Sequence, residues 1–198
     1  MRKVMAPAFS YRTIKELYPV FWSKASEAVL LIKDEVRRGY NASTPSIVDM
    51  EDWAARVALD IIGEAGFGSK FNSLTNPHAH VPEAYRAAFL VDETTRPIFV
   101  LSMLTTPTLT NLLPLKKVKD KLLGMKTISD WLRDFIEERK KEMYMNVDDV
   151  DYFKKSGHKD IITNVIHSRS MGVSELVDQS NSILAAGHGN YSTFLETA

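Results

Sequence analysis

Apolar residues recur at intervals of three and four along most of the chain, which is the spacing of one face of an α-helix. The clearest run extends from Ile14 to Val36. Arg37-Arg38-Gly39 is expected to end it, because cations and a glycine suit a helix C-terminus. A second run, from Met50 to Ala65, ends in Gly66-Phe67-Gly68. These patterns predict two long helices, the second of them buried on a broad face.

Further helices are predicted downstream. A short one covers Pro82 to about Thr94, and a long one runs from Val118 through Ile136 into a solvated charge run. The polar stretch 146–159 is a loop by composition, and Asp160 can cap a short helix that reaches Ile166. No strand pattern of useful length is present. We therefore expect a mainly all-α fold and a single domain over residues 1–198.

The last helix is expected to start near Ser174. Its apolar side carries Leu176, Val177, Ile183, Leu184 and Tyr191. Within it, the stretch Leu184-Ala185-Ala186-Gly187-His188-Gly189 contains several small residues, which leave a gap in side-chain volume. On the residues alone, a close-packed neighbouring helix is the favoured way to fill this gap, and a flat ligand is the alternative.

Charge and composition exclude several classes of function. Lys and Arg together number 25, as do Asp and Glu, so no overall electrostatic field draws the chain to nucleic acid. The chain has no cysteine, which excludes disulfides, thiolate nucleophiles and cysteine-ligated metal centres within it. No apolar stretch reaches the roughly 20 residues that a membrane-spanning helix needs.

Other motifs carry little chemistry. The glycine-rich stretch from Gly63 to Gly68 ends a helix, and its spacing does not match a dinucleotide-binding loop. His78 and His80 lack a nearby third ligand for zinc. The acidic cluster at 148–151 lacks the glycine and terminal glutamate of a calcium loop. We therefore predict no metal site among these residues.

The segment 97–115 is apolar and contains prolines at 97, 107 and 114, which break any long helix. It should either pack onto the domain as a buried loop or touch a membrane surface. Both interpretations stay open.

Four stretches, in order, resemble the cytochrome P-450 family of haem-thiolate monooxygenases, particularly the eukaryotic microsomal type. They are Met5-Ala6-Pro7-Ala8-Phe9-Ser10, Ala58 to Gly68 with Phe71-Asn72-Ser73-Leu74, Glu175 to Gln179, and Leu184 to His188. They look like the segment after the family's third helix, its fifth helix with its exit, and the long I helix on the oxygen side of the haem. The resemblance implies a partial fold, the distal helical half, truncated at both ends and lacking the proximal cysteine loop.

The resemblance also implies roles for particular residues. Arg2 matches an arginine that contacts a haem propionate, and Ala186, Gly187 and Asn190 match positions that face the haem. Ile183 would line the substrate pocket. Gly189 and Asn190 stand where the family has an acid and a threonine that relay protons. Because an amide does not titrate near neutral pH, no catalytic residue is intact.

The implied activity is oxygen insertion into a small apolar substrate, with electrons from an NADPH-dependent flavoprotein reductase, at the cytosolic face of the endoplasmic reticulum membrane. Without the cysteine ligand, this fragment should be inactive alone and should not bind haem stably. The alternative is a non-enzymatic helical binding or interaction module derived from the same fold. Without proximal partners, Ile183, Leu184, Phe194 and Leu195 should be partly uncovered.

Overall fold

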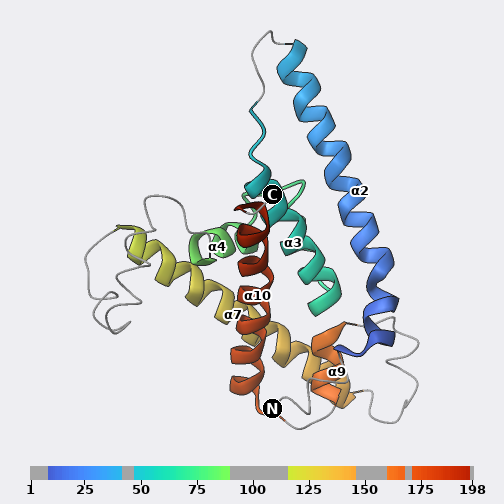
Figure 1. Ribbon diagram of the computed structural model, residues 1–198. Helices are drawn as coiled ribbons and strands as arrows, with labels where there is room; N and C mark the ends of the chain where they lie inside the picture. The colour runs from blue at the N-terminus through green and yellow to red at the C-terminus, as the bar shows by residue number, and fades with distance from the viewer. Residues whose placement is uncertain (1–8, 42–46, 90–115, 146–159, 168–170, 197–198) are drawn as a thin grey trace.

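The computed structural model describes residues 9–41, 47–89, 116–145, 160–167 and 171–196 (Figure 1). These ranges contain α-helices and no strand, which confirms the mainly all-α fold for the described part of the chain. The helices are α2 (Tyr11–Asn41), α3 (Met50–Phe67), α4 (His80–Phe89), α7 (Lys116–Met145), α9 (Ile161–His167) and α10 (Val173–Glu196). None of the helices described has the length and apolarity to cross a bilayer.

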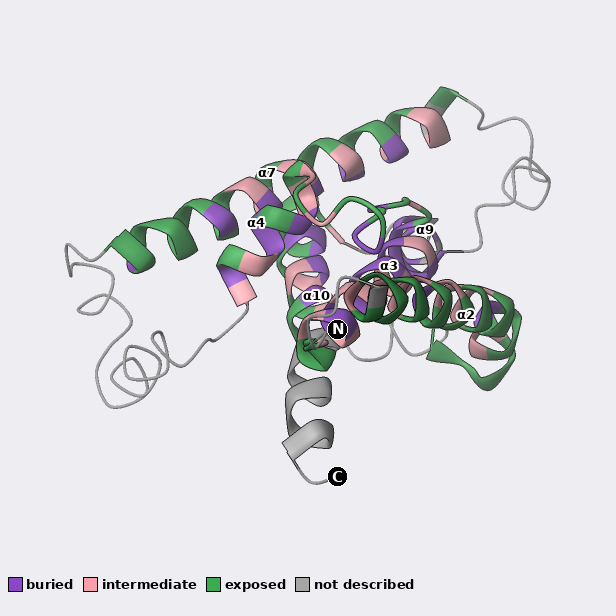
Figure 2. Ribbon diagram, turned by 90° about the horizontal axis from the view of Figure 1, so that it is seen from above, coloured by how far each residue is buried: buried purple, intermediate pink, exposed green. Residues whose placement is uncertain are grey.

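Helix α10 packs against both α3 and α7, and Figure 1 shows it crossing α7. Helix α4 packs on α7, α2 on α3, and α9 contacts both α3 and α7. The buried side chains of these helices form one main core. Figure 2 colours the ribbon purple at buried residues. Its most deeply buried large members are Phe67, Tyr85, Ile128, Leu132, Ile136, Ile162, Leu176 and Leu184.

Both ends of α3 are set by capping residues, Asp49 at the N-terminus and Gly68 at the C-terminus. Asp49 caps the N-terminus, because its side chain accepts a hydrogen bond from the amide of Asp52 at 3.0 Å. Gly68 has φ 63°, in the left-handed region, and its N–H donates to the carbonyl of Glu64. The helix exit predicted at Gly66-Phe67-Gly68 is therefore confirmed.

The C-terminal end of α3 lies beside the start of α9, although α4 and α7 separate the two helices in the sequence. The carboxylate of Asp160 accepts hydrogen bonds from the amide of Thr163 at 2.7 Å and from its hydroxyl at 2.8 Å, so the predicted cap of this short helix is confirmed. A Cβ at Gly68 would lie 2.9 Å from Oδ2 of the same carboxylate. The start of α9 is thus packed against the end of α3.

An aromatic cluster joins the C-terminal end of α3 to α7. Phe67 is fully buried, and its ring meets those of Trp131 and Phe135 edge to face, with centroids 5.9 and 6.0 Å apart. Phe71 meets Trp131 in the same way at 5.1 Å. Such pairs add to the free energy gained by burial of the rings.

Three predictions about these helices were wrong in detail. Helix α2 continues through Gly39 to Asn41, two residues past its predicted end. The charge run of α7 is not wholly solvated, because Arg139 is buried, with its guanidinium 5.1 Å from the ring centre of Phe135 and an ion pair to Glu142. Leu184 was expected to be partly uncovered, but only 1% of it is exposed, because it belongs to the main core.

Several predictions fall outside the described residues. These are the roles of Arg2, of the segment 97–115 and of the loop 146–159, the end of the helix predicted to reach Thr94, and the side chains of Tyr191, Phe194 and Leu195.

Candidate functional site

The predicted site residues other than Arg2 all belong to α10. Ile183 is half-buried and packs against the main core, whereas Ala185 and Ala186 are exposed. Positions 187, 189 and 190 are helical in their backbone, and their side chains lie outside the described part of the structure. The roles of these positions stay predictions.

The continuity of α10 decides which of these positions share a face. Ile183, Ala186, Gly187 and Asn190 stand at i, i+3, i+4 and i+7, so they form one stripe along the helix. Position 189 lies off this stripe. Helical geometry therefore groups the three positions predicted to face a haem with the one predicted to face a substrate, and Ala186 among them is exposed.

A buried tyrosine holds α10 at the start of this stripe. Tyr85 on α4 is only 1% exposed, and its hydroxyl donates a hydrogen bond of 3.2 Å to the carbonyl of Leu184. Tyr85 also packs beside Phe89, with ring centroids 5.0 Å apart. The sequence gives no indication of this contact, since the two residues are 99 positions apart.

Further contacts anchor the first half of α10. The side-chain amide of Asn181 donates to the hydroxyl of Ser129 on α7 at 3.1 Å. At the helix start, Glu175 accepts a hydrogen bond from the amide of Gly172 at 3.2 Å, as in a capping box. Among the described side chains of α10, the acids are Glu175 and Asp178, both more than one turn before Ile183. They do not lie on the stripe.

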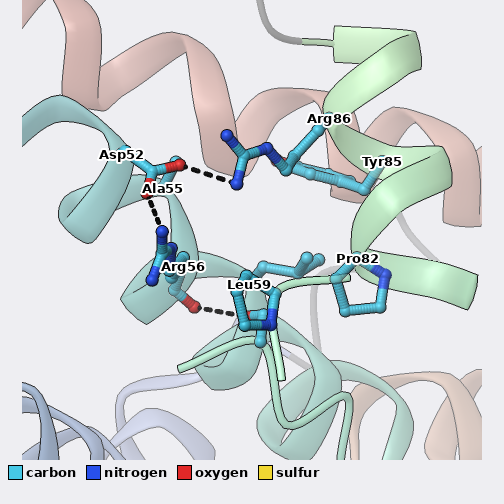
Figure 3. Close-up of a pocket in the computed structure, with 9 residues that line it drawn as sticks. Asp52, Ala55, Arg56, Leu59, Pro82, Tyr85 and Arg86 are labelled. Carbon is cyan, nitrogen blue, oxygen red and sulfur yellow. Dashed lines mark hydrogen bonds and ion pairs between the residues drawn. The ribbon is translucent and has the colours of Figure 1, made fainter. Parts of the chain in front are cut away.

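A second polar cluster joins α3 to α4 (Figure 3). Asp52 forms ion pairs with Arg86, at 3.0 Å, and with Arg56, one helical turn away. The cavity beside them has a volume of about 10 Å³, which is room for one water molecule and not for a substrate. Sequence analysis missed this cluster, although the i, i+4 spacing of Asp52 and Arg56 is typical of an ion pair.

A third cluster surrounds the buried carboxylate of Asp60. It accepts hydrogen bonds from the amide and hydroxyl of Ser73 at 2.7 and 2.9 Å, and from the amide of Leu74 at 3.2 Å. Burial of Lys24 nearby acts to lower the pKa of its amine, but the hydrogen bond and charge of Glu27, with the charges of Asp60 and Glu64, outweigh this effect and raise that pKa. These contacts hold the turn after α3 in place, and we assign them a structural role.

The described residues bring no three His, Asp or Glu side chains together in a way that could hold a metal ion. His78 and His80 are both exposed, and His80 begins α4.

Comparison with known proteins identifies the family. The family model of Cytochrome P450 matches residues 1–198. Cytochrome P450 monooxygenase FSL4 of Gibberella zeae is 36% identical over the whole chain, which covers 36% of that protein. Cytochrome P450 monooxygenase FUM15 of Gibberella moniliformis is 34% identical over the whole chain, which covers 33% of it. Cytochrome P450 monooxygenase sphH of Aspergillus fumigatus is 34% identical over 94% of the chain and 33% of its own length.

The chain thus spans about a third of the length of the curated relatives that it matches. The match to the family model extends over every residue, including those that form the stripe on α10 and the exit of α3. The chain belongs to the cytochrome P450 family.

Proposed function

We propose that this chain forms the distal, oxygen-side part of a haem-dependent monooxygenase. The overall reaction would be R–H + O₂ + NADPH + H⁺ → R–OH + H₂O + NADP⁺, with R–H a small apolar organic molecule and a flavoprotein reductase passing on the electrons. The observation that carries the proposal is the stripe on α10, where exposed Ala186 follows half-buried Ile183 on the helix that packs against both α3 and α7.

The residues of the stripe fit one side of a haem. Small side chains on a helix allow a flat ring to approach the backbone closely, and Ala186, which lies on the stripe, is exposed in the structure. The haem would supply the iron at which oxygen is activated. Residues 1–198 contain no cysteine, and the isoleucine, alanine, glycine and asparagine of the stripe are not ligands of haem iron, so the stripe would cover the haem and not ligate its iron.

Other residues would take supporting roles. Ile183 would present its exposed part to the apolar substrate, and Arg2 would pair with a propionate. Without a cysteine thiolate, we propose that residues 1–198 do not catalyse the reaction alone. The family resemblance also supports a location at the cytosolic face of the endoplasmic reticulum membrane, with 97–115 as the segment in contact with the membrane surface.

Proton delivery should be weak in this protein. Gly189 has no side chain that can hold a proton, and the amide of Asn190 can donate a hydrogen bond but does not titrate near neutral pH. A positioned general acid typically contributes about 10²- to 10⁴-fold to a rate. Without one, much of the reducing power should be lost as hydrogen peroxide, through O₂ + NADPH + H⁺ → H₂O₂ + NADP⁺.

The experiment uses a grafted protein in which residues 1–198 replace the matching third of Cytochrome P450 monooxygenase FSL4, with its haem and a reductase. The paired change Gly189→Glu with Asn190→Thr should raise product formed per NADPH consumed, and Gly189→Glu alone should raise it less. Product, peroxide and NADPH are measured together. Equal coupling in the parent and the double variant would show that protons reach oxygen by another route.

One observation favours the alternative of a non-enzymatic interaction module. Helix α2 exposes large apolar side chains, among them Tyr18 at 65%, Trp22 at 69% and Leu30 at 63%. Such a surface is typical of helices that pack against further protein. If the grafted protein folds but forms no product with any apolar substrate tried, while the 198-residue chain alone is stable and monomeric, the interaction module becomes the better account.

A further inference from the structure

Three consecutive residues of α4 contact three different helices. Gly124 of α7 lies so close to α4 that an added Cβ would be only 2.6 Å from the carbonyl oxygen of Ala84. The backbones of the two helices are therefore in close contact. The hydroxyl of Tyr85 reaches α10, and Arg86 forms its ion pair with Asp52 on α3. Successive helical residues are rotated by about 100°, so α4 is packed on three sides at once.

The contact of Tyr85 differs from the other two because it fixes a backbone group within the candidate site. The carbonyl of Leu184 lies between Ile183 and the exposed Ala185 and Ala186. A carbonyl oxygen has two lone pairs, and in an α-helix one of them accepts the amide of residue i+4. The tyrosine hydroxyl can therefore join α4 to this turn of α10 without replacing the bond within the helix.

We propose that Tyr85 is a positioning residue of the monooxygenase site. Its hydroxyl holds the turn from Ile183 to Ala186 at a fixed distance from α4, and this sets the space available to an apolar ligand beside the haem. The proposal rests on the proposed function. Tyr85 is 1% exposed, so it does not contact the substrate itself and acts through the backbone of Leu184.

The change Tyr85→Phe isolates the hydroxyl. Phenylalanine keeps the ring that packs beside Phe89, and the carbonyl of Leu184 keeps its bond within α10, so the fold should survive. The loss of one hydrogen bond of ordinary net strength should favour local opening of this turn by roughly 3- to 10-fold. Tyr18→Phe is the matched control, because the side chain of Tyr18 is 65% exposed on α2.

The first measurement is amide hydrogen exchange along the full chain, without haem or substrate. Tyr85→Phe should accelerate exchange by about 3- to 10-fold in the turns of α10 that follow Ile183 and leave buried amides of α3 and α7 unchanged. Tyr18→Phe should change neither. Acceleration spread evenly over α3, α7 and α10 would show that Tyr85 only adds to global stability. No acceleration would show that the hydroxyl does not stabilise this turn of α10. Either result overturns the proposal.

The second measurement uses absorbance titrations of the haem-loaded grafted protein with two nitrogen ligands of different size. Tyr85→Phe should weaken binding of 4-phenylimidazole by about 3- to 10-fold, because its ring needs the space beside α10, and should leave imidazole unchanged. Equal changes for both ligands, or none, would contradict a positioning role. If the grafted protein takes up no haem, the proposed function fails, while the exchange measurement still decides whether Tyr85 holds this turn.

Discussion

Replacement of Gly68 by alanine should destabilise the chain by about 2–3 kcal/mol, whereas the same change at Gly66 should stabilise it. Gly68 has φ 63°, a conformation that costs a residue with a Cβ roughly 1–2 kcal/mol. The new Cβ would also lie 2.9 Å from Oδ2 of Asp160, and a displaced Asp160 loses its cap on α9, which costs about 1 kcal/mol more.

Gly66 is the matched control, two residues away in the last turn of α3. A Cβ there would meet the side chain of Ile62 at 3.6 Å, an ordinary van der Waals contact. Alanine should gain roughly 0.5–1 kcal/mol at this helical position. Urea unfolding, followed by fluorescence of the tryptophans, measures both variants. If Gly68→Ala proves no less stable than Gly66→Ala, the left-handed exit of α3 and its contact with α9 are wrong.

Two further predictions concern the charged residues Asp60 and Lys24. Asp60→Ala should lower the free energy of unfolding by about 2–4 kcal/mol, because it leaves the amides of Ser73 and Leu74 without their acceptor. Thr75→Ala, at an exposed position of the same turn, should have little effect, and equal losses in the two variants would contradict the role of Asp60. Lys24→Gln should cost about 0.5–1 kcal/mol at neutral pH, after allowance for solvent screening. Since the folded state raises the pKa of Lys24 above 10.5, this contribution is complete below pH 10.5 and is lost as the pH rises through the folded-state pKa, so unfolding measured against pH should show the two proteins converging there. A difference that stays constant through this range would contradict the assignment.

The parts of the fold that sequence predicts best are those set by neighbours along the chain. The exit of α3 and the cap of α9 depend on a glycine and an aspartate that act within a few residues, and both were found as predicted. The end of α2 was placed too early at Arg37-Arg38-Gly39. A glycine near a helix end permits termination but does not force it, and the side chain of Arg38 donates to the carbonyl of Asp34 within the continuing helix.

Contacts between distant segments were beyond prediction from a single sequence. Arg139 looked solvated among its charged neighbours, yet only 8% of it is exposed in the folded chain. The burial of Leu184 and the hydrogen bond that its carbonyl accepts from Tyr85 depend on how α4, α7 and α10 cross. Periodicity shows which face of a helix is apolar, but it does not show which helix covers that face. The positions of the stripe on α10 could be named only from the family resemblance.

The carbon monoxide difference spectrum of the reduced protein shows whether residues 1–198 can form the distal side of a haem site. It is measured on the grafted protein and on residues 1–198 alone, each supplied with haem. We expect the spectrum of a thiolate-ligated haem from the grafted protein and none from the 198 residues, which contain no cysteine. A folded grafted protein without this spectrum, under conditions where the FSL4 relative shows it, would contradict the claim that these residues form the distal side of a haem site.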